Sequence, residues 1–485
     1  MSGLFYVAVT KSGALTQIDL GTLSILSFLS STILLLTGLA LPIALTKFTS
    51  ERLGKNQLED AASAQRTIVK MVLALSVTGL VVTVLLSEKL SQLLFGSLVH
   101  THLVILMLIY TFFFGIMDLC NSTLQALYLF GKISIVILLF IFVSRITALL
   151  LSLFHLGLAG VLMGYIAGSL VALAIAISYI RGKLPKTTHR TSLKPILKFS
   201  LPLFLSNLTL LIINWADVVI VTFVTSDYSV TGIYYIVINS ISVLSILWIP
   251  TTTTIFPVLS AKHGIERPED IANIIRISSR FLIYIVLPCC VSLAAVSSTA
   301  LTFFYGSSYV PGAMPLAILS IAKMLIAFYS LMTTGLSAMG KTTEVLKNNV
   351  VLAILTVVML FALVPFLETV GAALTRLARQ IIALALIFYV FRKEVRVELD
   401  KEALWKGSVA TSAIIPVLLI LDSTLTSRFT VLQTLSIEVL VAVSIYMTLL
   451  YLLRALNKQD FQLLEQAFPK SLTKYVRALE KLTVR

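Results

Sequence analysis

The sequence predicts an all-α protein that crosses a membrane many times. Of its 485 residues only 12% are charged and 58% are hydrophobic, whereas soluble proteins carry roughly 25% charged residues. Apolar runs long enough to cross a bilayer recur along the whole chain, and none of them alternates apolar with polar residues. Because only helices and closed barrels satisfy the backbone in lipid, these runs predict transmembrane helices.

The apolar runs predict about thirteen transmembrane helices, since each helix needs roughly twenty residues to cross the hydrocarbon core. They lie at 20–46, 71–87, 103–130, 133–154, 158–180, 200–224, 230–257, 281–305, 312–338, 348–367, 369–391, 408–424 and 431–453. The mean hydropathy of +1.00 agrees with a polytopic membrane protein.

Basic residues concentrate on one side of these helices, which holds roughly thirty of them. They lie at 47–70, 132, 181–198, 262–280, 341–347, 392–406 and 454–485. The other side has Lys11, Lys89 and Arg428. Because positive residues mark cytoplasmic loops, the pattern predicts an outer N-terminus and a cytoplasmic C-terminus. This topology explains the net charge of +15 without a nucleic-acid partner.

The C-terminal tail, 457–485, has apolar residues at helical spacing among lysines and arginines. The pattern predicts short helices lying on the anionic lipid of the inner leaflet. A solvated tail is the alternative.

The two halves of the chain resemble each other at an offset near 210 residues. Residues 94–97 (LFGS) align with 304–307 (FYGS), Gly21 aligns with Gly232, and Gly160 aligns with Gly371. The repeat unit holds an even number of helices, so both copies have the same orientation in the membrane. Such a parallel repeat is related by an axis along the membrane normal.

The repeat predicts six segments along the chain. They are an N-terminal helical lobe at 1–180, a basic cytoplasmic linker at 181–199, a C-terminal helical lobe at 200–392, a cytoplasmic loop at 393–407, two additional transmembrane helices at 408–454 and the basic amphipathic tail at 455–485.

The helix at 200–224 has almost no repeat partner in the first half. Subtracting the offset places most of that partner before Met1, and only Leu4 to Val9 could be its remnant. We therefore expect a fourteen-helix pattern that lacks its first helix through a misassigned or truncated start; a true thirteen-helix protein is the alternative.

Several stretches resemble a known transporter family. PLFLSNLTLLIINWADVVIV (202–221), GIYYIVINSISVLSIL (232–247) and TTTTIFPVLSAKHG (251–264) are similar to the polysaccharide-exporter and O-antigen flippase branch of the multidrug/oligosaccharidyl-lipid/polysaccharide (MOP) transporter superfamily. FFYGSSYVPGAMPLAILS (303–320) and LALPIALTKFTSE (39–51) look similar too. The resemblance implies two six-helix lobes around a central cavity, plus two C-terminal helices. It also implies alternating access that flips a lipid-linked oligosaccharide across the plasma membrane.

Four basic residues fall inside the predicted helices: Arg145, Lys323, Arg376 and Arg379. Each would cost about 2.5–3.5 kcal/mol if it faced lipid, so we expect them to face a wet cavity or a partner. Arg376 and Arg379 are three residues apart and share a helix face. Their fork geometry suits a diphosphate, and Lys323 adds a point charge. A cationic cavity of this kind favours a polyprenyl diphosphate sugar as substrate.

Two acids, Asp118 and Asp217, also lie inside predicted helices. They are either ion-pair partners for two of the four cations or groups that couple transport to protons or sodium. Asp217 is near the end of its helix, and an interfacial position is the simpler interpretation.

Other signals point to no cofactor, metal or nucleotide. Residues 335–342 (GLSAMGKT) match the phosphate-loop pattern, but they end an apolar helix and lack the preceding strand that this loop needs. The histidines are too scattered for a metal site. The three cysteines lie in apolar runs without a disulfide or zinc spacing.

A lipid-linked oligosaccharide flippase is therefore the predicted function. The first alternative is a multidrug cation antiporter of the same superfamily, coupled to protons or sodium, whose site should be acidic and aromatic. The second is an enzyme, a membrane glycosyltransferase or ligase, which should carry clustered carboxylates in an outer loop. The outer acids are single, namely Asp227, Glu368 and Asp422.

Overall fold

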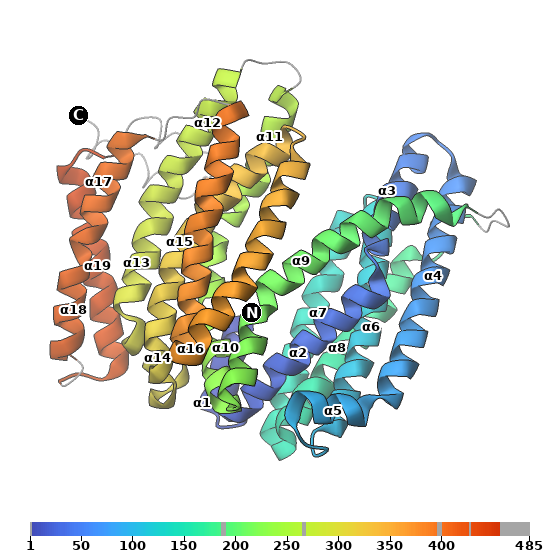
Figure 1. The fold of residues 1–485 in the computed structure, drawn as a ribbon, viewed down its shortest axis with the longest axis horizontal. Coiled ribbons are helices and arrows are strands. Elements are labelled where there is room, and N and C mark those ends of the chain that lie inside the picture. Colours follow the sequence, from blue (N-terminus) through green and yellow to red (C-terminus); the bar gives the residue numbers. More distant parts are fainter. Residues whose placement is uncertain (1, 186–190, 264–267, 395–399, 426–427, 456–485) are drawn as a thin grey trace. The chain divides into compact units, whose positions relative to one another are not determined.

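The computed structural model describes residues 2–185, 191–263, 268–394, 400–425 and 428–455. Every regular element in these residues is helical (Figure 1), which confirms the all-α prediction. Eleven helices in the described residues are long and apolar enough to cross a membrane. Two of them, at 51 and 52 residues, are interrupted near their middles. The number thirteen stays a prediction. The tail at 456–485 lies outside the described residues.

The chain forms two compact units, Met1–Ile236 and Val237–Arg485. The division falls inside one helix and differs from the linker at 181–199 that the repeat predicts. The lobe boundaries therefore stay a prediction.

Helix α6 is central in the first unit, since it contacts α2, α3, α4, α5, α7 and α8. The elements of this unit are α1 (Ser2–Lys11), α2 (Gln17–Gly38), α3 (Leu41–Gly54), α4 (Leu58–Leu85), α5 (Ser87–Phe95), α6 (Thr101–Ala126), α7 (Phe130–Leu151), the π-helical turn Ser152–Leu156, α8 (Gly157–Ile180), α9 (Leu193–Thr225) and the start of α10 (Tyr228–Ser242).

Helices α7 and α8 form a tight hairpin. The chain reverses where His155 has a φ of 64°. A Cβ on Gly164 would lie 2.3 Å from the backbone nitrogen of Ala148, and one on Gly168 would lie 2.5 Å from the Cβ of Ser144. Small residues therefore allow the two backbones to touch, as is common between transmembrane helices.

Helices α2 and α10 cross through a reciprocal glycine contact. A Cβ on Gly21 would lie 1.9 Å from the carbonyl oxygen of Tyr228, and a Cβ on Gly232 would lie 1.9 Å from that of Gln17. Each glycine thus faces the residue that lies four positions before the opposite glycine in the sequence. These are the two glycines that the repeat alignment equates, so the crossing has the local two-fold symmetry that the repeat predicts.

The second unit contains the rest of the chain. Its elements are the end of α10, the short 3₁₀ segment Val243–Leu247, α11 (Ile249–His263), α12 (Pro268–Phe281), the π-helical turn Leu282–Val286, α13 (Leu287–Ala295), α14 (Ser297–Tyr305), the 3₁₀ segment Ser307–Gly312, α15 (Ala313–Ala338), α16 (Thr342–Glu394), α17 (Lys401–Ser412), α18 (Ile414–Leu425) and α19 (Val431–Leu452).

Helix α16 is a second hairpin. It breaks at Glu368, whose φ is 46° and ψ is −123°. A Cβ on Gly371 would lie 2.5 Å from the carbonyl oxygen of Leu363 in the preceding limb. Gly160 is in a similar position in the first unit, where its Cβ would lie 2.8 Å from the carbonyl carbon of Leu151. The repeat equates these two glycines as well.

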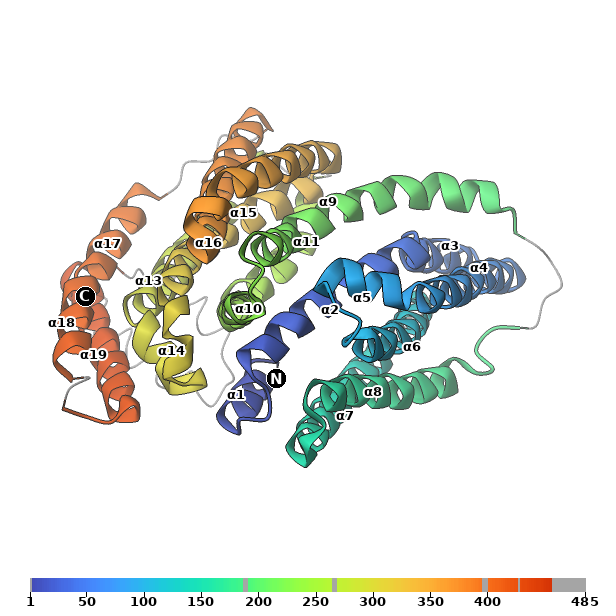
Figure 2. The same cartoon turned by 60° about the horizontal axis from the view of Figure 1, so that its bottom comes forward.

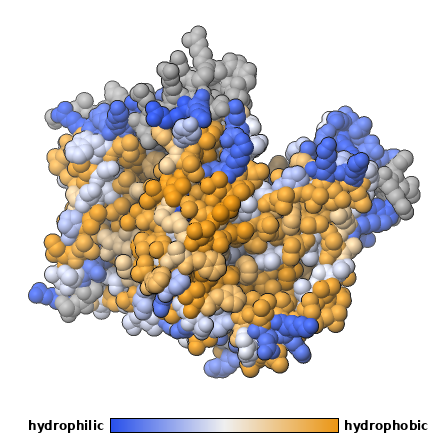
Figure 3. All heavy atoms as spheres, viewed as in Figure 1, coloured by the Kyte–Doolittle hydropathy of each residue, from blue (hydrophilic) through white to orange (hydrophobic). Residues whose placement is uncertain are grey.

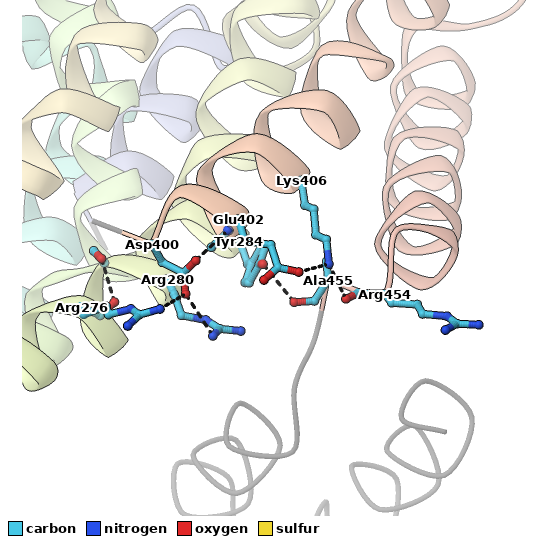
Figure 4. Close-up of polar contacts among 10 residues, drawn as sticks. Arg276, Arg280, Tyr284, Asp400, Glu402, Lys406, Arg454 and Ala455 are labelled. Carbon is cyan, nitrogen blue, oxygen red and sulfur yellow. Dashed lines mark hydrogen bonds and ion pairs between the residues drawn. The ribbon is translucent and has the colours of Figure 1, made fainter. Parts of the chain in front are cut away.

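The last three helices, α17 to α19, form one group (Figure 2), and polar contacts tie one end of it to the rest of the second unit (Figure 4). Asp400 caps α17 by accepting from the Ala403 amide at 3.1 Å, and it also pairs with Arg280 at 3.2 Å. Lys406 donates to the carbonyl of Arg454 at 2.9 Å. These contacts fix the start of α17 and the end of α19 in place.

Apolar side chains dominate the middle of the surface shown in Figure 3, and hydrophilic ones gather at the helix ends. Large exposed apolar residues such as Phe366, at 84% exposure, are costly in water and suited to lipid. The protein is therefore a multi-pass membrane protein.

Candidate substrate- and ion-binding sites

Arg145 on α7 lies among aromatic rings in the first unit. Its guanidinium donates a hydrogen bond to the Tyr165 hydroxyl on α8. The guanidinium carbon is 4.8 Å from the ring centroids of both Phe5 and Tyr165, and 6.0 Å from that of Tyr6. A desolvated cation–π contact of this kind stabilises the charge by about 2 kcal/mol. Within the first unit the charge of Arg145 is therefore stabilised by aromatic residues.

More tyrosines extend this cluster. The hydroxyls of Tyr6 and Tyr235 are 3.1 Å apart, and the ring centroid of Tyr110 is 5.5 Å from that of Tyr165. Two members, Phe5 and Tyr6, come from α1, the segment interpreted from the sequence only as a remnant. Sequence reasoning missed them because nothing in a ten-residue stretch indicates which distant arginine it will cover.

The other three predicted cations come together in the second unit. Lys323 on α15 interacts electrostatically with Arg376 and Arg379, which lie on the second limb of α16. The Lys323 ammonium is 5.9 Å from the ring centroid of Trp248, and Arg379 is only 6% exposed. Like charges repel strongly in such surroundings, so an anion bound among them lowers the energy.

A polar network continues from this group. Arg379 interacts electrostatically with Tyr329, whose hydroxyl donates to the Asn349 side-chain oxygen at 3.0 Å and accepts from the Asn348 amide at 3.3 Å. The structure thus brings together three of the four cations expected from the sequence. Because Arg145 belongs to the other unit, its contribution to one common site stays a prediction.

Asp118 on α6 lines a cavity of about 380 Å³ inside the first unit. Asn207, Asn214 and Trp215 of α9 line it too. Within the described residues Asp118 has no hydrogen-bond or ion-pair partner. The lining is otherwise largely apolar, with residues such as Leu34 and Val72, so one carboxyl group and one indole face a cavity large enough for a small ligand.

Asp217 on α9 is in different surroundings. It is 2% exposed and accepts a hydrogen bond of 2.6 Å from the Tyr234 hydroxyl on α10. This contact ties α9 to the first part of α10 within the first unit. Roles for either acid in ion coupling stay predictions.

Comparison with known proteins identifies the family. A model of the polysaccharide biosynthesis protein family matches residues 14–263, slightly more than half of the chain. The chain belongs to the polysaccharide biosynthesis protein family. Among curated protein sequences, none matches this family member significantly.

Solved structures share its fold. The inward closed structure of the lipid II flippase MurJ superposes with a TM-score of 0.73 at 14% identity, over 92% of this chain and 95% of that one. An inward-facing MATE multidrug resistance transporter of the MOP superfamily gives 0.67 at 13% identity, over 80% and 94%. A Pyrococcus furiosus MOP transporter, described as having a binding pocket of reverse polarity, gives 0.53 at 14% identity, over 80% and 94%. The chain therefore has the MOP transporter fold, as the resemblance predicted.

One buried acid was not among the residues predicted from the sequence. Glu438 lies in the middle of α19 and is 0% exposed. A glutamate inside the apolar run 431–453 was a visible signal, because intramembrane acids are rare and functional by default. Its partner Asp422 was interpreted only as a single acid of an outer loop.

Proposed function

We propose that this polysaccharide biosynthesis protein is a flippase. It moves a lipid-linked oligosaccharide or polysaccharide precursor across the plasma membrane by alternating access, with its C-terminus in the cytoplasm. Membership in the family and the fold shared with the lipid II flippase MurJ support the proposal. The observation that carries it is the group of Lys323, Arg376 and Arg379 in the second unit.

The chemistry of this group suits a diphosphate. Two guanidinium forks three residues apart can each grip a pair of phosphate oxygens, while the ammonium of Lys323 neutralises further charge. A polyprenyl diphosphate-linked glycan offers these oxygens at the junction of lipid and sugar. We propose that Arg145 serves the same substrate, where its aromatic neighbours Phe5 and Tyr165 keep the guanidinium oriented.

A flipping assay on the purified protein in liposomes tests the proposal. We expect Lys323→Ala, Arg376→Ala and Arg379→Ala each to lower the initial rate about 10- to 100-fold at limiting substrate. A hydrogen bond to a charged group contributes about 1.5–3 kcal/mol, and each 1.4 kcal/mol is a factor of ten.

Lys347→Ala is the matched control, because Lys347 is exposed and pairs with Glu344 outside this group. It should flip substrate at the wild-type rate. Wild-type rates in all three cavity variants would contradict the assigned site, and a wild-type protein that flips no lipid-linked glycan would contradict the function.

A multidrug cation antiporter is the second candidate, and one observation favours it. The cavity around Asp118 and Trp215 has the acidic and aromatic character that a cationic drug site needs, and MATE transporters share the fold. If this candidate is correct, a fluorescent cationic dye quenches the fluorescence of Trp215, and Asp118→Asn removes the quenching. Dye efflux without glycan flipping would favour this candidate over the flippase.

A further inference from the structure

Three helices at one end of the second unit, α14, α18 and α19, hold a pair of acids. Helix α19 packs against both α14 and α18. Asp422 on α18 and Glu438 on α19 are the only charged residues in these three helices. The pair therefore lies in apolar surroundings that supply no basic residue of their own.

Glu438 is completely buried and faces Asp422. It is 0% exposed, and the two side chains interact electrostatically. Apart from this contact with Asp422, neither of its carboxyl oxygens has a hydrogen-bond partner in the part of the chain that the structure describes. Asp422 accepts a hydrogen bond from the Thr299 hydroxyl on α14, so three helices converge on the pair.

Thr434 is a second, independent sign that something is bound here. It lies four residues before Glu438 on the same face of α19, and it is 0% exposed. Its hydroxyl has no hydrogen-bond partner among the described residues. A buried hydroxyl without a partner is rare in native proteins, and so is a buried carboxyl group whose partner is a second carboxyl group; each calls for a bound ion or water.

Two facing carboxylates cannot satisfy one another. An ionised carboxyl group only accepts hydrogen bonds, so the pair needs a proton or a cation between its oxygens. Two negative charges at close range in a medium of low dielectric repel strongly, and one positive charge removes most of that repulsion. Carboxylate pairs elsewhere resolve this conflict by sharing a proton.

We propose that Asp422 and Glu438 bind one monovalent cation between them, a proton or a sodium ion, with the Thr299 and Thr434 hydroxyls completing the site. The two carboxyl groups and two hydroxyls offer six oxygens, which is the lower limit of the six to eight ligands that calcium takes. No group of three or more His, Cys, Asp or Glu side chains placed to hold a metal exists within the described residues. The inference goes beyond the proposed flippase activity and does not depend on it.

Other charged residues belong to the segments next to these three helices. Arg428 belongs to the connection between α18 and α19, and Lys401, Glu402 and Lys406 lie on α17, which also packs against α19. Glu402 pairs with Lys406 at 2.5 Å and its side chain is 71% exposed. It therefore provides a matched control for the same chemical substitution.

Binding of radioactive sodium and infrared difference spectroscopy on the full-length protein in lipid nanodiscs test this inference. If a proton occupies the site, the protein at neutral pH shows the absorption of a protonated carboxyl group, and Glu438→Gln removes it whether or not sodium is present. If sodium occupies the site, the protein binds it, and Glu438→Gln lowers the affinity at least tenfold.

Asp422→Asn should have the same effect as Glu438→Gln and serves as the second variant if one of them does not fold. Glu402→Gln should behave as the wild type in both measurements. The inference is overturned if the wild type shows neither signal, or if the signal persists in every folded variant of the pair.

Discussion

Buried charges in this polysaccharide biosynthesis protein are stabilised by partners of different kinds. Arg145 lies among aromatic rings, whose electron-rich faces replace part of its hydration. Asp400, outside the membrane-spanning segments, is held by Arg280, Arg276 and a backbone amide. Lys323 lies beside two further cations. The first two residues are stabilised by other groups of the protein, and the third belongs to the group for which we propose a substrate anion as ligand.

Asp400→Asn should destabilise the second unit in a pH-dependent way. Burial alone would raise the pKa of Asp400, but the Ala403 amide and the two arginines outweigh it and hold the pKa below its ordinary value. A lowered pKa contributes stability above the pKa of the unfolded state, and this contribution is lost as the pH falls through the folded-state pKa. Because Arg280 is only 13% exposed, we expect a loss of about 3 kcal/mol at neutral pH.

Thermal unfolding in detergent at a series of acidic to neutral pH values measures this effect. The melting temperatures of the wild type and Asp400→Asn should converge at acidic pH. Glu344→Gln, at the exposed pair with Lys347, should leave the melting temperature unchanged. A difference between wild type and Asp400→Asn that is the same at every pH would show that the ion pair is not its cause.

At the scale of elements, the sequence predicted some helix breaks and missed others, since the predicted run 20–46 crosses the break between α2 and α3 at Leu39 and Ala40. It placed chain reversals between 154 and 158 and between 367 and 369, and the structure confirms both, at His155 and Glu368. These breaks were visible because apolar runs are interrupted there by polar residues. The packing of α1 onto Arg145 and the meeting of Asp422 with Glu438 were not visible, because both depend on contacts between residues far apart in the chain.

Gly21→Ala should force α2 and α10 apart. The added Cβ would lie 1.9 Å from the Tyr228 carbonyl oxygen, a backbone atom that cannot move without its helix. Overpacking of this kind costs about 1–3 kcal/mol. Gly232→Ala should have a similar effect, because the contact is reciprocal.

Gly38→Ala on the same helix is the control, since nothing lies within 4 Å of its added Cβ. Alanine is the better helix former, so this variant should be as stable as the wild type or more stable. Thermal unfolding compares all three variants. Equal melting temperatures for Gly21→Ala and Gly38→Ala would show that the crossing is loosely packed.

At the scale of the whole molecule, fold class and family followed from composition, apolar runs and resemblance. The orientation in the membrane stays a prediction from charge alone. The prediction depends on the concentration of lysine and arginine in every second loop between transmembrane helices. This pattern indicates on which side of the membrane each loop lies, but not how the helices pack. A labelling experiment can test the orientation of the two units separately.

Membrane-impermeant thiol labelling of intact cells should modify cysteines placed at Lys89 in the first unit and at Arg428 in the second. Lys55→Cys and Lys347→Cys should react only after the membrane is permeabilised, although both lysine side chains are well exposed, at 61% and 66%. The background for all four is a variant lacking Cys120, Cys289 and Cys290. In a parallel repeat both halves have the same orientation. The pair in the first unit, positions 89 and 55, should therefore label in the same way as the pair in the second unit, positions 428 and 347. Opposite labelling of the two pairs would mean an inverted repeat, and with it a miscounted helix between residues 89 and 347.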